Sequence, residues 1–595
     1  MSVSVSKITG NIELKLTAYH NCDDVQLFWR AKVDGKQDAA IPGCLGFMIE
    51  RQRIIKDKLL AEVEILRNRV GFTDGNAGDE FAESVSPSKP SIIWPFQRYD
   101  WTDHGANSGQ TVRYNIKAMS LPQGKKAGED VLSVIAESGW TEPIEVSAYS
   151  GKGISAFFNR GMVMSQYVGR IVRKNNWKPE DIVSHVKELE DPLRVFLSGE
   201  LRIEMLKIIT EVFNNKDVEL YAALYELNDK ELIDGLKSIG KRAHILLANG
   251  SDKKHDGNLA ARGELIGADV DVRDRLLRGK GLGHNKFAVV ASVNGDEKSA
   301  IKVWTGSTNW SFTGLCTQLN NGILIEDPAI AEMFLKQWNL LDNAGNCFTK
   351  KLIDANDRSP QSSGSIDVWF APMHNNFGED EPGPDLKELI EMVLGAKRAI
   401  LFVMFEPGEK SKLVSSILGM PDNIYVRGVK NTVANSSETF SLHEKGTSQE
   451  FRTRVIQPEG IKKDFSGWIG EVTREQFITT GKNKGIGHAI THAKMIVIDP
   501  LDEDCKIITG SHNFSKSASE KNDENFVVIH GNKPLAEAYA VSCLATYSHY
   551  RWRAYLKETA SSGKIPWSHL SDNPIWQAKY LSSQRKKHLD LWCPW

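Results

Sequence analysis

The stretch THAKMIVID, residues 491–499, combines a strand-like apolar run with ionisable side chains on either side of it. Residues 495–498 have the continuous hydrophobicity that is typical of a buried strand. His492 and Lys494 precede this run on alternate residues, so both side chains point to the same face. The stretch therefore predicts a buried strand that presents a histidine and a lysine together at its start.

The same spacing occurs earlier, in GHNKFAVV (283–290), where His284 and Lys286 precede an apolar run. Each pair is followed by a similar segment, TGSTNWSFTGLCTQLNNGILIED (305–327) and TGSHNFSKSASEKNDENFVVIHG (509–531). Two pairs with matched followers in one order indicate an internal duplication rather than chance.

The segments before each pair also repeat. The sequence predicts a strand at 218–224, a helix from about Asp229 and a strand at 243–247, and the same order returns in RAILFVMFEPGEKSKLVSSILGMPDNIYVRGV (398–429). An apolar helical segment precedes each unit. Repeated strand–helix–strand units predict two α/β halves.

The first part of the chain has a different character. Segments such as IELKLTAYH, VQLFWRAKV, GCLGFMIERQR, TVRYNIKAM and WTEPIEVS alternate aromatic and β-branched residues between turn residues, which predicts an antiparallel β-sandwich. The pattern resembles a fibronectin type III module, with Trp29 early, Tyr114 late and SGWTEPIEV as the closing strand. Such a domain is a spacer or a binding site for a protein partner.

These patterns predict a domain order. We expect a β-sandwich at 1–148, a helical connector at 149–194, a first α/β half at 195–355, a polar linker at 356–366, a second half at 367–550 and a C-terminal segment at 551–595. The C-terminal segment has eight Lys and Arg against three acids and many tryptophans. It is either a helical wrap over the catalytic core with buried tryptophans or a surface that stacks on single-stranded nucleic acid.

Composition limits the class of protein. The 595 residues include 41% hydrophobic and 25% charged residues with a net charge of −2, so no bulk positive field indicates nucleic acid. Seven cysteines without metal-ligand spacing predict neither a zinc site nor a disulfide framework, and they favour a reducing, cytoplasmic setting. We expect no secretory leader and no transmembrane segment, because no stretch of 18 apolar residues occurs.

The paired motifs resemble those of the phospholipase D superfamily, His-x-Lys-x4-Asp followed by Gly-Ser-x-Asn, over residues 195–550 approximately. The second half matches throughout, in His492, Lys494, Asp499, Gly510, Ser511, Asn513 and Glu524. The first half matches in His284, Lys286, Gly306, Ser307 and Asn309 but has Ala291 for the aspartate and Asn320 for the acid that aligns with Glu524. The resemblance implies a pseudo-dimer of two halves around one active site.

This set of side chains suits a phosphodiester. Lys286, Lys494, Asn309, Asn513 and the hydroxyls of Ser307 and Ser511 are expected to donate to the phosphate oxygens. No carboxylate cluster is available for magnesium, so we expect no metal and no cofactor. One histidine would attack phosphorus, and the other would protonate the leaving oxygen and then activate water.

The choice of nucleophile depends on the partner of each imidazole, since a carboxylate on the second nitrogen fixes the tautomer and supports the cation. Glu524 is expected to serve His492, whereas Asn320 offers His284 a neutral partner. The hypothesis is therefore that His492 attacks and that His284 is the general acid. Asp499 is expected to be a supporting, structural anion.

Three functions remain open. The first is a metal-independent nuclease that cleaves DNA or RNA through a phosphohistidine. The second is a phospholipase D or phosphatidyltransferase that acts on phospholipid headgroups. The third is a catalytically weak nucleic-acid-binding protein, which Ala291 and Asn320 would explain. The basic inserts at 251–283 and 431–487 precede each histidine and are expected to border the substrate.

Overall fold

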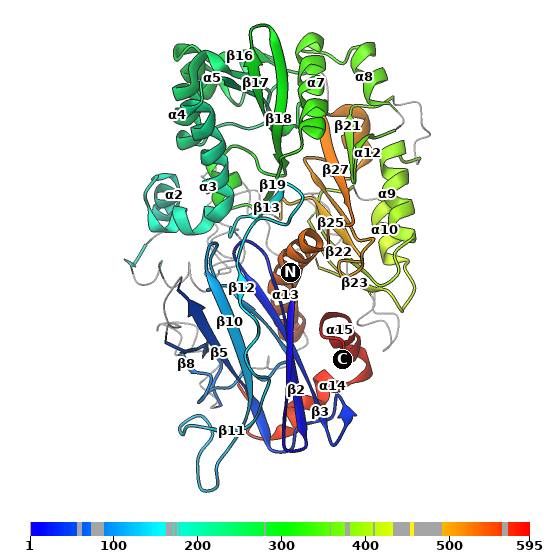
Figure 1. The fold of residues 1–595 in the computed structure, drawn as a ribbon. Helices are drawn as coiled ribbons and strands as arrows, with labels where there is room; N and C mark the ends of the chain where they lie inside the picture. The colour runs from blue at the N-terminus through cyan, green and yellow to red at the C-terminus, as the bar shows by residue number, and fades with distance from the viewer. Residues whose placement is uncertain are drawn as a thin grey trace. The chain divides into compact units, whose positions relative to one another are not determined.

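The computed structural model describes residues 2–55, 62–72, 88–161, 171, 175–177, 179–278, 281–357, 359–374, 381–408, 411–431, 453–456, 491–561 and 569–595. The chain divides into two compact units. One unit holds residues 1–147 and 552–595, and the other holds the described residues from 148 to 551. Figure 1 shows the ribbon of both units.

The first unit contains two antiparallel sheets. One sheet has the order β1-β2-β3-β4 with β9 on β3, and the other has the order β11-β10-β5-β6 with β12 on β10. Their bounds are β1 Val3–Thr9, β2 Ile12–His20, β3 Val25–Val33, β4 Lys36–Gln37, β5 Cys44–Ile54, β6 Glu64–Ile65, β9 Asp100–Asp103, β10 Thr111–Ser120, β11 Ser133–Glu137 and β12 Ile144–Glu145. A short pair, β7 Arg67–Asn68 and β8 Lys89–Pro90, lies beside them. The predicted antiparallel sheets are confirmed, although WTEPIEVS forms a strand only at Ile144–Glu145.

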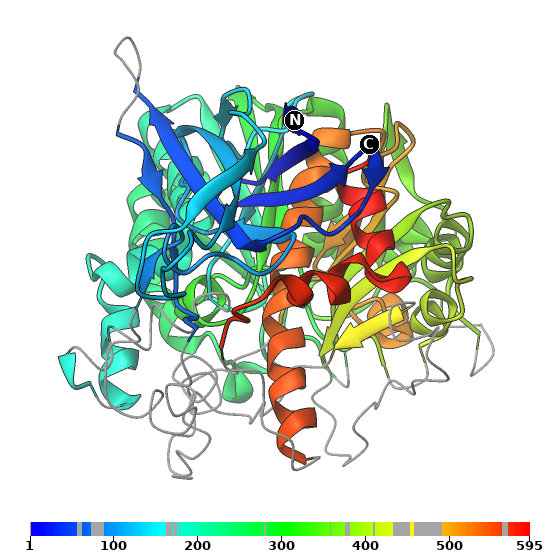
Figure 2. The same cartoon turned by 90° about the horizontal axis from the view of Figure 1, so that it is seen from below.

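The C-terminal segment completes the core of this unit. It contains the 3-10 turn η3 Pro574–Gln577 and the helices α14 Ala578–Leu581 and α15 Ser583–Trp592. Trp576 and Leu589 are buried with Trp29 and Phe47 in one apolar cluster. Figure 2 shows these red helices beside the blue strands. This segment was expected to wrap the catalytic core, but Trp576 and Trp592 are buried against the sandwich. Trp595 is partly exposed and lies over Lys32 of the sandwich.

The second unit contains two mixed sheets with the same order of strands. The first is β13-β19-β18-β17-β14-β15-β16, and the second is β21-β27-β26-β25-β22-β23-β24 with β20 added at its edge. The first has β13 Ile154–Phe158, β14 Val218–Leu224, β15 Ala243–Leu247, β16 Asp271–Asp274, β17 Lys286–Asn294, β18 Glu297–Gly306 and β19 Asn321–Ile325. The second has β20 Gln361–Ser363, β21 Ile366–Ala371, β22 Ala399–Phe405, β23 Tyr425–Asn431, β24 Thr453–Ile456, β25 Met495–Ile498, β26 Lys506–Gly510 and β27 Glu524–His530. The predicted duplication into two α/β halves is therefore present in the fold.

Helices cover these sheets. The first half has α2 Pro179–Lys187, α3 Pro192–Asn214, α4 Lys230–Ile239, α5 Leu259–Gly267, α6 Phe312–Cys316, α7 Pro328–Ala344 and α8 Lys350–Asn356, with 3-10 turns η1 Gly240–Arg242 and η2 Lys253–His255. The second has α9 Pro384–Leu394, α10 Lys412–Leu418, α12 Lys516–Lys521 and α13 Lys533–Ser561. Asp229 begins α4, because its side chain accepts a hydrogen bond from the backbone N–H of Leu232. No helix among the described residues is long and apolar enough to cross a membrane.

Two boundaries differ from those predicted. Residues 154–158 were expected in a helical connector, but they form β13, which pairs antiparallel with β19 at the edge of the first sheet. The alternating apolar residues Ile154, Ala156 and Phe158 are buried, which is a strand periodicity. The predicted linker also contains β20, which pairs with β21.

Hydrogen bonds and an ion pair join the two sheets of the second unit. The Thr305 hydroxyl donates to Asn525 Oδ1 at 2.6 Å, and in the reciprocal position Asn321 Nδ2 donates to the Thr509 hydroxyl at 2.7 Å. Arg275 forms a buried two-point ion pair with Asp523, at 2.8 and 2.9 Å. These contacts hold the end of β18 against the start of β27 and the end of β26 against the start of β19.

Candidate active site

The two histidines of the repeated motif lie close together where the two sheets meet. His284 immediately precedes the β17 region and His492 immediately precedes the β25 region, and each is the second residue before a buried lysine. Their ring centroids are 6.4 Å apart. Only 5% of His284 and 4% of His492 is exposed. The fold thus places residues 208 positions apart in one buried polar cluster.

Each histidine contacts the acid or amide of the other half. Nδ1 of His284 lies 2.9 Å from both carboxylate oxygens of Glu524, and Nδ1 of His492 lies 2.9 Å from Asn320 Oδ1. The expectation that Glu524 serves His492 is therefore wrong. The repeat spacing is the same in both halves, but the strands β19 and β27 lie across the junction from their own histidines.

Asn320 is held in one orientation. Its Nδ2 donates to the Gly314 carbonyl at 2.9 Å, and its Oδ1 accepts from the Ser307 hydroxyl at 2.8 Å. Because an amide oxygen can only accept, the His492 Nδ1 must carry the proton. The remaining nitrogen, Nε2, is then free to bind or release a proton.

The motif serines support these partners. Ser511 donates to Glu524 at 2.7 Å, as Ser307 does to Asn320, and both serines are fully buried. Sequence reasoning expected both hydroxyls to bind phosphate, but in this structure their protons are directed to the partners of the histidines. The preceding glycines allow the strands to approach: a Cβ on Gly306 would lie 2.5 Å from the Asn321 carbonyl, and one on Gly510 would lie 2.3 Å from that of Asn525.

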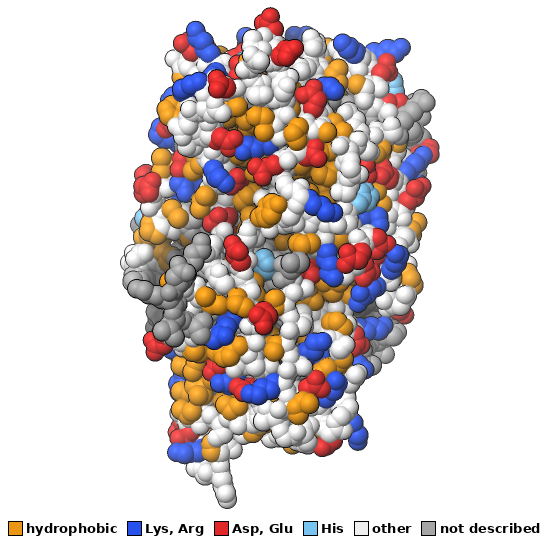
Figure 3. All heavy atoms as spheres, viewed as in Figure 1, with side chains coloured by type: hydrophobic (Ala, Val, Ile, Leu, Met, Phe, Trp, Pro, Cys, Tyr) orange, Lys and Arg blue, Asp and Glu red, His pale blue; other side chains and the backbone are white. Residues whose placement is uncertain are grey.

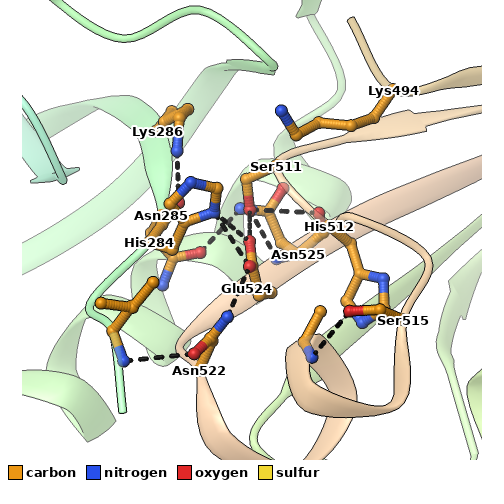
Figure 4. A network of polar contacts seen from close by, with 12 residues as sticks. His284, Asn285, Lys286, Lys494, Ser511, His512, Ser515, Asn522, Glu524 and Asn525 are labelled. Carbon is orange, nitrogen blue, oxygen red and sulfur yellow. Dashed lines mark hydrogen bonds and ion pairs between the residues drawn. The ribbon is translucent and has the colours of Figure 1, made fainter. Parts of the chain in front are cut away.

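The two motif lysines are equally buried and equivalent in their contacts. Lys286 Nζ donates to the His284 carbonyl at 2.8 Å, and Lys494 Nζ donates to the His492 carbonyl at 2.7 Å. Figure 4 shows them on opposite sides of the Glu524 network. Burial lowers the pKa of Lys286 to about 7, while the charge of Glu524 acts to raise it. Burial and the charge of Lys286 lower the pKa of Lys494 well below its usual value.

Burial also governs the histidines and Glu524. Burial, followed by the charges of the two lysines, lowers the pKa of His284 and of His492 well below the usual histidine value. Burial raises the pKa of Glu524. Burial and the neighbouring lysines therefore favour neutral imidazoles, and a bound anion would favour their protonation. Such a site suits a neutral nucleophile and an acid that is protonated when substrate binds.

Sequence reasoning missed two carboxylates and two aromatic rings. Tyr225 and Glu226 directly follow β14, and Phe405 and Glu406 occupy the equivalent end of β22. The Tyr225 ring lies 4.9 Å from that of His284, and the Phe405 ring lies 4.8 Å from that of His492. The signal was present, because an aromatic residue followed by glutamate ends the first predicted strand of each half.

The remaining predicted residues differ in their positions. Asn309 Nδ2 donates to Glu226 at 2.8 Å. The Oδ1 atoms of Asn309 and Asn513 are buried and have no hydrogen-bond partner in the described part of the chain. Asp499 lies at the far end of β25, where it accepts from the backbone N–H groups of residues 397, 398 and 399 at 2.8, 2.7 and 2.8 Å. Asp499 thus fixes the turn before β22. Its replacement by Ala291 in the first half changes no group at the histidines.

The predicted basic inserts are only partly described. In the first insert, Arg275 forms an ion pair with Asp523 and donates hydrogen bonds to the carbonyls of Gly345 and Cys347. Arg273 pairs with Asp271 and Asp342. Most of 431–487 lies outside the described residues. Where the contacts are described, the arginines of these inserts stabilise the fold instead of lining the site.

A buried histidine next to the motif serine has a supporting position. His512 Nδ1 accepts from the backbone N–H of Phe514 at 2.9 Å, and its Nε2 lies 3.3 Å from both Ser519 and Asp385. Burial lowers the pKa of His512 to about 4 and raises that of Asp385 to about 6. These contacts anchor the Gly-Ser-His-Asn turn to the start of α9.

The donor set fits a phosphate better than a metal. Across the described ranges no group of three or more His, Cys, Asp and Glu residues has a metal-binding arrangement. The cluster instead pairs two ammonium groups with two imidazoles and two asparagines, which are the donors that a phosphate oxyanion prefers.

Residues 428–542 match the family model described as "Cardiolipin synthase, PLD-like domain". This part of the chain is similar to a phospholipase D-like domain. The matched phospholipase D-like domain contains His492, Lys494, Ser511, Asn513 and Glu524, and the sheet of the first half repeats its strand order. No curated protein sequence matches the chain.

Solved structures provide weak similarities. Phosphatidylserine synthase from Haemophilus influenzae is 12% identical over 60% of this chain and 91% of its own, with a TM-score of 0.38. The phospholipase D family member Nuc from Salmonella typhimurium is 19% identical over 31% of this chain and 95% of its own, with a TM-score of 0.18. Polyphosphate kinase from Porphyromonas gingivalis is 11% identical over 60% of this chain and about half, 53%, of its own, with a TM-score of 0.35. At these scores the similarities bear on neither substrate nor mechanism.

Proposed function

We propose that the chain is a phosphodiesterase that works without a metal, through a covalent phosphohistidine, in a single active site between the two halves. The observation that carries this proposal is the separation of 6.4 Å between the His284 and His492 rings, with Lys286 and Lys494 beside them. The match of residues 428–542 to a phospholipase D-like domain supports a phosphodiesterase or phosphotransferase reaction.

The geometry reverses the assignment of the nucleophile. The Glu524 carboxylate contacts Nδ1 of His284, so it fixes the tautomer with the proton on Nδ1 and supports the positive charge that forms on attack. Asn320 gives His492 a neutral acceptor, which leaves its Nε2 proton easier to release. In the proposal His284 is the nucleophile and His492 is the general acid and base.

The first step forms a bond between His284 Nε2 and phosphorus while the bond from phosphorus to the leaving oxygen breaks. His492 Nε2 gives its proton to that oxygen. In the second step His492 takes a proton from water, the water oxygen bonds to phosphorus, and the nitrogen–phosphorus bond breaks. Lys286, Lys494, Asn309 and Asn513 are assigned to the phosphate oxygens in both steps.

For the substrate we propose a nucleic acid strand, with phospholipid headgroups as the second candidate. The description of the matched family model, cardiolipin synthase, favours the second candidate. On the face drawn in Figure 3, lysines and arginines are interspersed with acids, so this face offers no continuous basic surface to nucleic acid.

One assay tests reaction and substrate together. The purified protein with a chelator is incubated with labelled single- and double-stranded DNA, with RNA and with phosphatidylcholine vesicles. Chelator-resistant cleavage of nucleic acid is expected, choline release would select the second candidate, and activity abolished by the chelator would overturn the metal-free mechanism.

The nucleophile is tested with bis(p-nitrophenyl) phosphate. We expect a trapped phosphohistidine in His492→Ala, because the activated leaving group departs without an acid and the base for hydrolysis is missing. None should form in His284→Ala. Trapping in His284→Ala alone would return the nucleophile to His492.

We also propose that the β-sandwich is fibronectin type III-like and available to a protein partner. The adjacency β2-β3-β9 in one sheet and β11-β10-β5-β6 in the other supports this proposal for the sandwich. Pull-down with the intact chain, compared with a variant altered on the exposed Val131 and Val134, tests whether β11 and the turn before it bind a partner.

We propose a cytoplasmic setting for the chain, because its seven cysteines are free thiols.

A further inference from the structure

Glu226 lies at the candidate site but is not part of the duplicated motif. It follows β14 directly, and its carboxylate accepts a hydrogen bond of 2.8 Å from Nδ2 of Asn309. Only 4% of Asn309 is exposed, and its Oδ1 is buried with no hydrogen-bond partner among the described residues. The only contact that fixes this amide from outside its own turn therefore comes, among the described hydrogen bonds, from Glu226.

The surroundings of Glu226 are strongly charged. Burial raises the pKa of the Glu226 carboxyl, while the ammonium groups of Lys286 and Lys494 and the hydrogen bond from Asn309 act to lower it. Tyr225 is its neighbour in the chain, and the Lys286 ammonium lies 5.2 Å from the centre of the Tyr225 ring. The other titratable groups around the two lysines are Glu524, Glu406, His284 and His492.

Two buried ammonium groups in one site repel each other and lose hydration, and both effects favour the neutral amine. A neutral amine is a poor ligand for a phosphate oxyanion. The site therefore needs carboxylates that lie close enough to hold the protons on the lysines without blocking the phosphate. Glu524 is engaged by His284 and Ser511, whereas Glu226 is engaged by Asn309.

We propose that Glu226 is a positioning residue of the phosphodiester site, which orients the Asn309 amide and supplies a counter-charge that favours the protonated forms of Lys286 and Lys494 before substrate binds. This inference rests on the proposed function for the identity of the ligand. The charge relation supports it, because the Glu226 carboxylate raises the pKa of Lys286, which burial lowers to about 7. Loss of that carboxylate would make binding of an anion require uptake of a proton at neutral pH.

The test uses sulfate, which keeps the same charge across the range and needs no turnover. Sulfate binding to the full chain is measured by calorimetry from pH 5.5 to 9 for the wild type, Glu226→Gln, Glu226→Asp and the exposed control Glu297→Gln. Glutamine keeps the length of the side chain and an oxygen for Asn309 but removes the charge. We expect the alkaline midpoint of binding to fall by about one pH unit in Glu226→Gln, with affinity at pH 8 about tenfold weaker.

The aspartate variant separates charge from hydrogen bonding. It keeps the carboxylate, so its midpoint should stay near that of the wild type, as should the midpoint of Glu297→Gln. Glu226→Met, neutral and of similar length, repeats the charge test if the glutamine variant does not fold. Coincident midpoints in the wild type and in a folded neutral variant would overturn the inference.

The two proposals fail differently. If the wild type cleaves bis(p-nitrophenyl) phosphate but the neutral variant binds sulfate with an unchanged midpoint, the role of Glu226 is lost and the phosphodiesterase stands. If the midpoint shifts but no phosphodiester is cleaved, the charge role stands and the proposed function is lost.

Discussion

Glu524 contacts Nδ1 of His284 with both carboxylate oxygens at 2.9 Å, although the two residues belong to different halves of the duplicated fold. The equivalent pair, His492 and Asn320, has an amide in place of the carboxylate. The two halves are therefore similar in fold and different in charge. This asymmetry gives each imidazole a separate role.

Glu524→Gln tests the carboxylate of this pair. Glutamine can still accept from His284 but cannot stabilise the imidazolium, so we expect kcat to fall about 10²–10⁴-fold. Because burial raises the pKa of Glu524, the charged carboxylate costs stability, and the variant should be at least as stable as the wild type at pH 7. Kinetics and urea unfolding measure both effects. Glu503→Gln, at an exposed carboxylate, is the control, and a fully active Glu524→Gln would contradict the role.

Asn320→Asp tests the amide. A carboxylate on Nδ1 would favour the charged form of His492, so the alkaline limb of the kcat profile should move up by about one pH unit or more. The same change places a carboxylate oxygen against the Gly314 carbonyl, where Asn320 now donates, and the melting temperature should fall. Asn343→Asp on the exposed side of α7 is the control, and an unmoved alkaline limb would remove His492 as the acid.

Asp499→Ala is expected to affect stability and leave the chemistry unchanged. The variant loses the acceptor for three backbone N–H groups, at a cost of about 3 kcal/mol in the free energy of unfolding. Urea unfolding measures this cost, while kcat per folded molecule should match the wild type. Asp502→Ala, whose carboxylate pairs with Arg398 at the surface, should cost less than 1 kcal/mol, on the order expected for an exposed ion pair. A large loss of kcat in folded Asp499→Ala would place Asp499 in the reaction.

His512 predicts a dependence of stability on pH. Burial lowers its pKa from 6.5 to about 4, so the unfolded chain binds the proton more readily than the folded chain between these values. The contribution of neutral His512 to the free energy of unfolding is fully present above pH 6.5. It is lost as the pH falls toward 4, by a total of about 3 kcal/mol. Asp385, whose pKa burial raises to about 6, acts in the opposite sense.

The comparison of the wild type with His512→Asn isolates this contribution. Unfolding free energies are measured at pH 7 and pH 4, and the difference between the two proteins should shrink at the lower pH. An exposed histidine, His255→Asn, is the matched control. A difference that is equal at both pH values would show that His512 is protonated in the folded protein.

The local structure and the site residues were largely predictable from the sequence. Apolar runs fix β14 at Val218–Leu224 and β15 at Ala243–Leu247, because buried strands leave an unmistakable hydrophobic pattern. The repeated His-x-Lys spacing located the lysines and histidines that the fold brings together. Short-range patterns of this kind depend on residues that are close in the chain.

Long-range pairing was not predictable in the same way. The spacing from the motif serine to the aligned amide or acid is 13 residues in both halves, from Ser307 to Asn320 and from Ser511 to Glu524. This spacing therefore cannot indicate which histidine the Glu524 carboxylate contacts. Edge strand β13 was missed because its partner β19 lies more than 150 residues away. Burial of tryptophans was foreseen in the C-terminal segment, but hydrophobicity alone does not identify the surface that buries them.

The dependence of the sandwich on the C-terminal segment sets an order of maturation. Gln577 hydrogen-bonds Tyr99 and the backbone of Ile41, and Arg30 pairs with Asp590. A ribosome makes residues 148–551 between these partners, so the domain that emerges first waits with an uncovered apolar face until the rest of the polypeptide has been synthesised. Premature termination anywhere in the catalytic region would leave that nascent face without its cover and expose it to aggregation or to chaperones.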